Sequence, residues 1–191
     1  RVHISLLDPE SSLTYRGSYL GKKKVLTFGA GYQTESEAVY GNVAGLDMPK
    51  DYQAYTYDLF FEYPTVAGTF TASGAYLKAD FDNAYQGADP DPRSTGLNGE
   101  KNGWYAKAGY LLPQTIASGK LQIYGRAEKW QFAELYGIYD QQIKWSAFGI
   151  NYYVKGQNLR LTLEYSMNDY VKEDAVNKDF KTVTTMLQFR I

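Results

Sequence analysis

Charged side chains alternate with apolar ones in several segments of this sequence. Arg126 and Glu128 do so within 121–128, and Arg160 and Glu164 do so within 159–167. Because successive side chains of a β-strand point to opposite faces, these segments predict strands with one charged face and one apolar face. We expect one common polar face to carry Asp58, Glu62, Lys107, Arg126, Glu128, Lys144, Arg160, Glu164 and Arg190. We assign Lys78 and Asp80 to the same face.

Two interpretations of this polar face remain open. If the sheet encloses water, the charges line a conduction path, and Lys107 and Arg126 on neighbouring segments form the basic pair to test first. Alternatively, Arg126 with Glu128, and Arg160 with Glu164, form ion pairs that only stiffen the sheet. Since the two signs of charge nearly cancel, the sequence predicts no strong anion selectivity.

Other kinds of chemistry find little support in the residue types. The chain has no cysteine, a single histidine at His3, and serines at 11 and 12 without a visible partner base. The acidic segment 80–91 has oxygen ligands that calcium accepts, but its spacing differs from that of an EF-hand. A net charge of -1 leaves no basic face for nucleic acid. We therefore expect no enzyme, no metal site and no cofactor.

Alternation with period 2 covers almost the whole chain, and helical periodicity is nearly absent. We expect about nine strands, at 2–7, 26–33, 55–63, 69–81, 104–112, 121–128, 147–154, 159–167 and 181–191. The chain has 19 tyrosines, 9 phenylalanines and 3 tryptophans, yet its mean hydropathy is -0.46. No run approaches the roughly 18 apolar residues of a membrane-spanning helix. This pattern predicts a single all-β domain over residues 1–191, an antiparallel transmembrane β-barrel.

The lengths of the expected connections support a membrane barrel. Short turns at 64–68, 113–119 and 155–157 alternate with longer polar connections at 36–50, 82–101, 132–141 and 169–178, and only 13–24 breaks the rule. Bacterial outer-membrane barrels have short turns at the periplasmic rim and long loops outside. Aromatic residues near the strand ends predict interfacial girdles. These are Tyr63, Tyr76, Trp104, Tyr110, Trp130, Trp145, Tyr152, Tyr165 and Tyr170.

A count of nine strands conflicts with the even count of bacterial barrels. A sheet edge with unpaired backbone groups cannot face hydrocarbon. We therefore expect this chain to be the C-terminal portion of a larger barrel whose further strands precede Arg1, unless one strand is miscounted.

Four motifs in a shared order resemble a known family. They are YLGKKKVLTFGAGY at 19–32, DLFFEY at 58–63, GWYAKAGYLLP at 103–113 and GINYYVKGQNLR at 149–160. They are similar to the C-terminal half of the phosphate-selective porin O and P family. The resemblance implies a sixteen-stranded barrel, usually a homotrimer, in the bacterial outer membrane. The last residues resemble the signal read by the barrel-insertion machinery, although Ile191 stands where that signal has an aromatic residue.

From the residues and the resemblance together we expect an outer-membrane porin. Its expected partners are outer-membrane lipid and small hydrophilic solutes or anions, phosphate-like anions among them, that diffuse passively through a water-filled barrel. A barrel that scaffolds partners without open conductance is the alternative. A soluble all-β module that binds carbohydrate is a third hypothesis.

Overall fold

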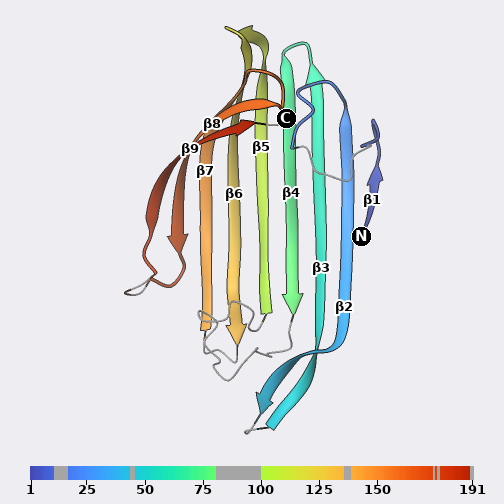
Figure 1. The fold of residues 1–191 in the computed structure, drawn as a ribbon, viewed down its shortest axis with the longest axis vertical. Helices are drawn as coiled ribbons and strands as arrows, with labels where there is room; N and C mark the ends of the chain where they lie inside the picture. Colours follow the sequence, from blue (N-terminus) through green and yellow to red (C-terminus); the bar gives the residue numbers. More distant parts are fainter. Residues whose placement is uncertain are drawn as a thin grey trace.

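The structure, a computed structural model, describes residues 1–10, 17–43, 46–80, 100–135, 139–173, 175 and 177–189 (Figure 1). These residues form nine strands. They are β1 (Val2–Ser5), β2 (Val25–Val43), β3 (Leu46–Thr65), β4 (Gly68–Asp80), β5 (Glu100–Ile116), β6 (Gly119–Leu135), β7 (Tyr139–Tyr153), β8 (Leu159–Tyr170) and β9 (Phe180–Phe189). None of the described residues forms a helix that is long and apolar enough to cross a membrane.

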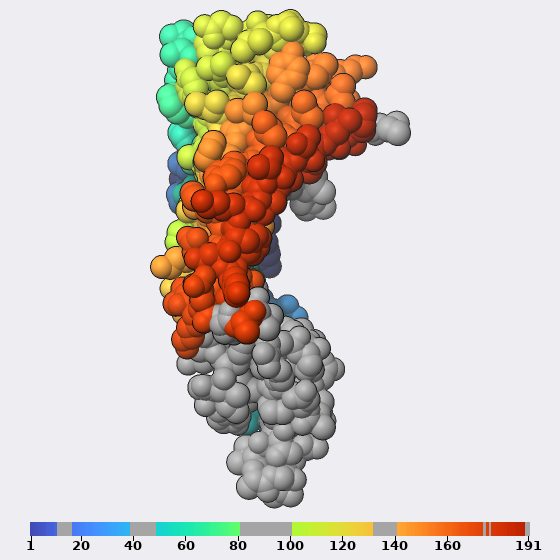
Figure 2. All heavy atoms as spheres, turned by 90° about the vertical axis from the view of Figure 1, so that its left-hand side faces the viewer, coloured from blue at the N-terminus to red at the C-terminus, as the bar shows by residue number. Residues whose placement is uncertain are grey.

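The nine strands form one antiparallel sheet in which each strand pairs with its neighbours in the sequence. The strand count and the all-β class confirm the expectation from the sequence. Among the described residues no pairing joins β1 to β9, so these two strands are the edges of a sheet that is not closed. Figure 2, viewed from the β9 side, shows β9 in red running obliquely across the sheet.

Connections at one end of the sheet are short, as expected. The turns after β3, β5 and β7 lie together at the top of Figure 1, and β3 and β4 are separated by only Val66 and Ala67. The prediction of a loop over 36–50 is wrong, because β2 and β3 continue into a long hairpin with a register shift between Glu35 and Val39. The polar sequence there gave no hydrophobic alternation from which to extend the strands. The expected loop over 82–101 is too long at its end, because β5 begins at Glu100, and its remaining residues, 82–99, lie outside the described residues.

One face of the sheet is apolar and exposed, and we call it the outer face. Its middle row consists of residues that oppose one another in the register from β3 to β9. They are Phe61, Ala72, Ala108, Gly125, Phe148, Tyr165 and Val183. Phe148 is 62% exposed and Val183 is 69% exposed, so these side chains meet the surroundings rather than a core. A second apolar layer does not cover them in the described part of the chain.

The segment that joins β1 to β2 is longer than the other connections at this end because part of it packs against the sheet. Residues 17–24 pack against the opposite face, which we call the inner face, near the short turns. Leu20 packs there in a small buried cluster with Leu111 and Tyr153. Leu20 and Gly21 both have positive φ angles of 56° and 77°, and a Cβ at Gly21 would lie 2.5 Å from the Thr69 hydroxyl. The turn at this position therefore requires glycine.

Candidate functional site

A cavity of about 420 Å³ opens on the inner face. Its lining comes from β4, β5, β6, β7, β8 and β9 and from Gly17, which a flat sheet could not bring around one space. The lining includes five of the charged residues predicted for a common polar face. These are Lys107, Arg126, Glu128, Arg160 and Glu164. The sheet therefore curves around this charged cluster.

Arg126 is the centre of the cluster. Its guanidinium forms one ion pair with Glu128 at 2.5 Å and another with Glu164 at 2.8 Å. The same guanidinium lies 4.6 Å from the centre of the Trp145 ring. The two carboxylates have further partners, because the Tyr124 hydroxyl donates to Glu164 and the Trp130 indole N–H donates to Glu128. Arg126 is thus held in place and its charge is fully compensated.

The other two cations of the cluster lack a carboxylate partner. Lys107 opposes Arg126 in the register of β5 and β6, and its Nζ lies 4.2 Å from the centre of the Tyr124 ring. The Arg160 guanidinium donates to the side-chain oxygen of Gln188 at 2.7 Å. Neither residue makes an ion pair with any residue that the structure describes. The predicted pairing of Arg126 with Glu128 is therefore present, whereas Glu164 pairs with Arg126 instead of Arg160.

A ladder of uncharged polar side chains lies beside this cluster on the inner face, and two of its members, Asn151 and Thr162, line the same cavity. Gln122 accepts hydrogen bonds from Asn151 and the Tyr153 hydroxyl, both at 3.0 Å, and donates to Thr71 at 3.2 Å. Thr162 extends the ladder by donating to Asn151 at 2.7 Å. Sequence reasoning missed this network, although its members alternate in phase with Arg126 and Arg160. A chain of this kind rigidifies the wall under the charged cluster.

Glu62 lies on the inner face but does not line an open space. It is fully buried, and its two carboxylate oxygens accept hydrogen bonds from the backbone N–H groups of Tyr19 at 2.7 Å and Gly21 at 2.8 Å. The side-chain amide of Gln157 also donates to the Ser18 carbonyl at 2.8 Å. Glu62 and Gln157 therefore hold the segment 17–24 against the inner face. The sequence contained no signal for this contact across 41 positions.

Three further predicted residues have different placements. Asp58 is on the inner face and accepts two hydrogen bonds of 2.7 Å from Arg1. Lys144 is on the outer face, because its neighbour Trp145 contacts Arg126 on the inner face and Lys144 opposes Lys129. The assignment of Lys144 to the inner face is therefore wrong. Arg190 lies outside the described residues.

The face assigned to Lys78 and Asp80 is also wrong. Both positions share the parity of Ala72, which opposes Phe61 on the outer face, and the two side chains approach each other within 3.8 Å. Small residues on both sides of β4 left the sequence without a clear apolar face. The girdle prediction fails for Trp130 and Trp145 as well, since both contact the inner charged cluster.

The described residues contain no group of three or more histidine, cysteine or acidic side chains placed to hold a metal ion. Asp82, Asn83, Asp89 and Asp91 of the acidic segment lie outside the described residues.

One family model matches the chain, and the match extends over residues 11–191. That model is described as phosphate-selective porin O and P. The chain belongs to this family. No curated protein and no solved structure matches the chain. Outer-membrane porins have barrel walls with an apolar side toward lipid and a polar side toward a water-filled interior, and the curved sheet of this chain has an apolar outer face and a charged inner face.

Proposed function

We propose that this porin lets small hydrophilic solutes, including anions, diffuse passively through the bacterial outer membrane. The observation that carries the proposal is the difference in polarity between the two faces of the sheet. The outer face exposes rings and aliphatic chains to the surroundings, while the inner face gathers charged and hydrogen-bonding groups on its concave side. Hydrocarbon outside and water inside is the environment that satisfies both faces.

The open edges favour a larger closed wall. Unpaired N–H and C=O groups at β1 and β9 would each cost several kcal/mol in hydrocarbon. We propose that further strands pair with these edges to complete a barrel, in keeping with the sixteen strands implied by the family. The same expectation includes a homotrimer and recognition of β9 by the barrel-insertion machinery.

A mild preference for anions follows from the charges of the inner cluster. Three cations, Lys107, Arg126 and Arg160, face two carboxylates, and both carboxylates are engaged by Arg126. The cluster therefore carries one net positive charge, and Lys107 and Arg160 are its cations that make no ion pair with a described residue. Phosphate-like anions are suitable solutes for such a pair, because lysine and arginine both bind phosphate oxygens.

The test is the zero-current potential of the intact porin across a planar bilayer with a salt gradient. Lys107→Glu changes the wall charge by two units, which acts on a monovalent ion roughly 8 Å away in water with about 1 kcal/mol before salt screening. We expect the anion-to-cation permeability ratio to fall about fivefold. Lys181→Glu is the matched control, because Lys181 opposes Met167 on the outer face. An equal shift in both variants would contradict the proposal.

The alternative is a barrel that scaffolds partners without open conductance. The segment 17–24, which packs against the inner face, is the observation that favours it. Absence of single-channel conductance from the folded, inserted protein would select this alternative.

A further inference from the structure

Two lysines continue a row of three aromatic residues on the outer face. The row runs across six strands, displaced from the middle row of the outer face toward the long connections, and its members oppose one another in the register. They are Tyr57, Tyr76, Trp104, Lys129, Lys144 and Asp169. Tyr57 is 57% exposed and Trp104 is 40% exposed. Exposed tyrosine and tryptophan at one level mark the headgroup region of a membrane.

The two lysines face each other without a neutralising partner. Lys129 and Lys144 are directly opposite on β6 and β7, where strands lie about 4.8 Å apart. Neither forms an ion pair with any described residue. Asp169 opposes Lys144 on its other side but makes no ion pair with it. Like charges placed opposite each other destabilise a strand pair, so an anion bound between them would relieve the repulsion.

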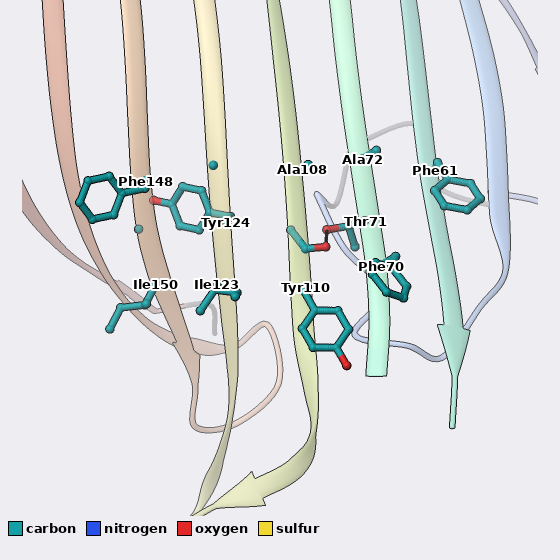
Figure 3. A pocket seen from close by; sticks show the side chains of 13 residues that line it. Phe61, Phe70, Thr71, Ala72, Ala108, Tyr110, Ile123, Tyr124, Phe148 and Ile150 are labelled. Atoms are coloured by element: carbon teal, nitrogen blue, oxygen red, sulfur yellow. Dashed lines mark hydrogen bonds between the residues drawn. The ribbon is translucent and has the colours of Figure 1, made fainter. Parts of the chain in front are cut away.

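An apolar furrow begins next to this pair and runs along the outer face toward the short turns. Ala127 and Gly125 follow Lys129 along the outer side of β6, and Ala106 and Ala108 oppose them on β5. These four residues line a hollow of about 570 Å³. It shares Ala72, Ala108 and Gly125 with a cavity of about 740 Å³ whose rims include Phe61 and Phe148, and Figure 3 shows Ala72 and Ala108 lying between these two rings. An acyl chain fits such a channel of small residues.

Backbone packing does not account for the glycine in this furrow. A Cβ at Gly125 would meet no neighbour closer than the Ala147 carbonyl oxygen at 3.7 Å, an ordinary contact distance. A larger residue is thus sterically possible, and glycine at this position leaves the furrow open.

We propose that the outer face holds one phosphorylated, acylated lipid, with its phosphate between Lys129 and Lys144 and an acyl chain in the furrow below them. The proposal rests on the proposed function only in requiring that the outer face contacts the membrane. Bacterial barrels direct their long loops outward, so the lipid belongs to the outer leaflet. A basic pair beside apolar surface is the arrangement that recognises anionic lipid headgroups.

The charges favour a lipid over a second copy of the chain as the occupant. A protein partner seated on the furrow would have to bury two unpaired lysines, which is strongly unfavourable. A free phosphate ion would neutralise the lysines but would leave the furrow unused. A lipid satisfies both parts of the site at once.

The test is a native mass-spectrometry titration of the intact porin, purified in an uncharged detergent. The probes are lipid A carrying two phosphates, the same lipid without phosphate, and inorganic phosphate. Each basic residue near an anionic lipid contributes about a fivefold gain in affinity. We therefore expect Lys129→Gln with Lys144→Gln to weaken lipid A binding on the order of twentyfold, and Asp169→Asn to strengthen it. Lys107→Gln is the control of identical chemistry on the inner face, for which we expect no change.

Three results would overturn the proposal. They are unchanged binding in the double glutamine variant, equal binding of lipid A with and without phosphate, and inorganic phosphate competing as well as lipid A. Lys129→Arg with Lys144→Arg preserves both charges and should retain binding, which separates loss of the site from loss of folding. Gly125→Val fills the furrow and should weaken lipid binding. If it lowers the oligomeric mass instead, a second copy is the occupant.

The two proposals fail separately. A wild-type protein that binds lipid A in a phosphate-dependent way but does not conduct would refute only the porin function. Conductance without phosphate-dependent lipid binding would refute only the lipid site.

Discussion

The contact between Glu62 and the segment 17–24 gives a prediction whose magnitude can be worked from the structure. Glu62 is fully buried and accepts two backbone N–H groups at 2.7 Å and 2.8 Å. Hydrogen bonds to a charged group each contribute about 1.5–3 kcal/mol. Glu62→Gln keeps the shape of the side chain but can accept with only one oxygen, and its amide then faces the second N–H. We expect the local opening of this segment to become easier by about 2 kcal/mol.

Trypsin reports this opening directly, because the segment contains Lys22, Lys23 and Lys24. When cleavage is slow compared with reclosing, its rate follows the population of the open form. A change of about 2 kcal/mol corresponds to a factor of about thirty, since about 1.4 kcal/mol is tenfold. We expect cleavage at these lysines in Glu62→Gln to accelerate by roughly that factor, while the strands stay protected.

The matched control is Asp58→Asn, which makes the same chemical change on the inner face. Asp58 accepts hydrogen bonds from Arg1 and, among the described residues, forms no hydrogen bond or ion pair with the segment 17–24. Equal cleavage rates for wild type and Glu62→Gln would refute the role of Glu62. Equal acceleration in Asp58→Asn would show that general loosening, rather than this contact, exposes the lysines.

Two further predictions concern the inner wall. Arg126→Gln leaves Glu128 and Glu164, which are 14% and 12% exposed, without their cation. We therefore expect the free energy of unfolding, measured by urea denaturation in lipid, to fall by about 3 kcal/mol. A fall of less than about 1 kcal/mol would contradict the central role of Arg126. Gln122→Leu strips Asn151 of a buried acceptor and should destabilise the barrel by about 1–3 kcal/mol, whereas an unchanged urea midpoint would show that the polar ladder is dispensable.

Part of the inner face could be predicted because its residues follow the local alternation of polar and apolar side chains along one strand. Along β6 the polar residues Gln122, Arg126 and Glu128 alternate with apolar or small ones, and the structure places them on the inner face. The opposition of Lys107 and Arg126 also follows from neighbouring antiparallel strands. These properties depend on one strand or on one pair of strands, and a sequence reports them through side-chain parity.

Lys144 shows why charge alone was a poor guide. Its position is in phase with Phe148 and Ile150, so parity places it outside, but its charge suggested the lumen. A lysine can lie on the outer face at the level of the membrane headgroups, because its ammonium group reaches the polar region there. The level of a residue relative to the membrane depends on the register of several strands, which a single segment does not contain.

Antiparallel strands, their number, the apolar and polar sides of most of them, and the resemblance to a porin family could all be predicted from the amino-acid sequence. These follow from period-2 alternation and from motif order. Three features became visible in the folded chain alone: Arg126 holds both Glu128 and Glu164, Glu62 fixes the segment 17–24, and Lys129 and Lys144 lie at the end of an apolar furrow. Such contacts join residues on different strands that curvature and register bring together. Curvature and register depend on how several strands pair, so no single segment of the sequence predicts them.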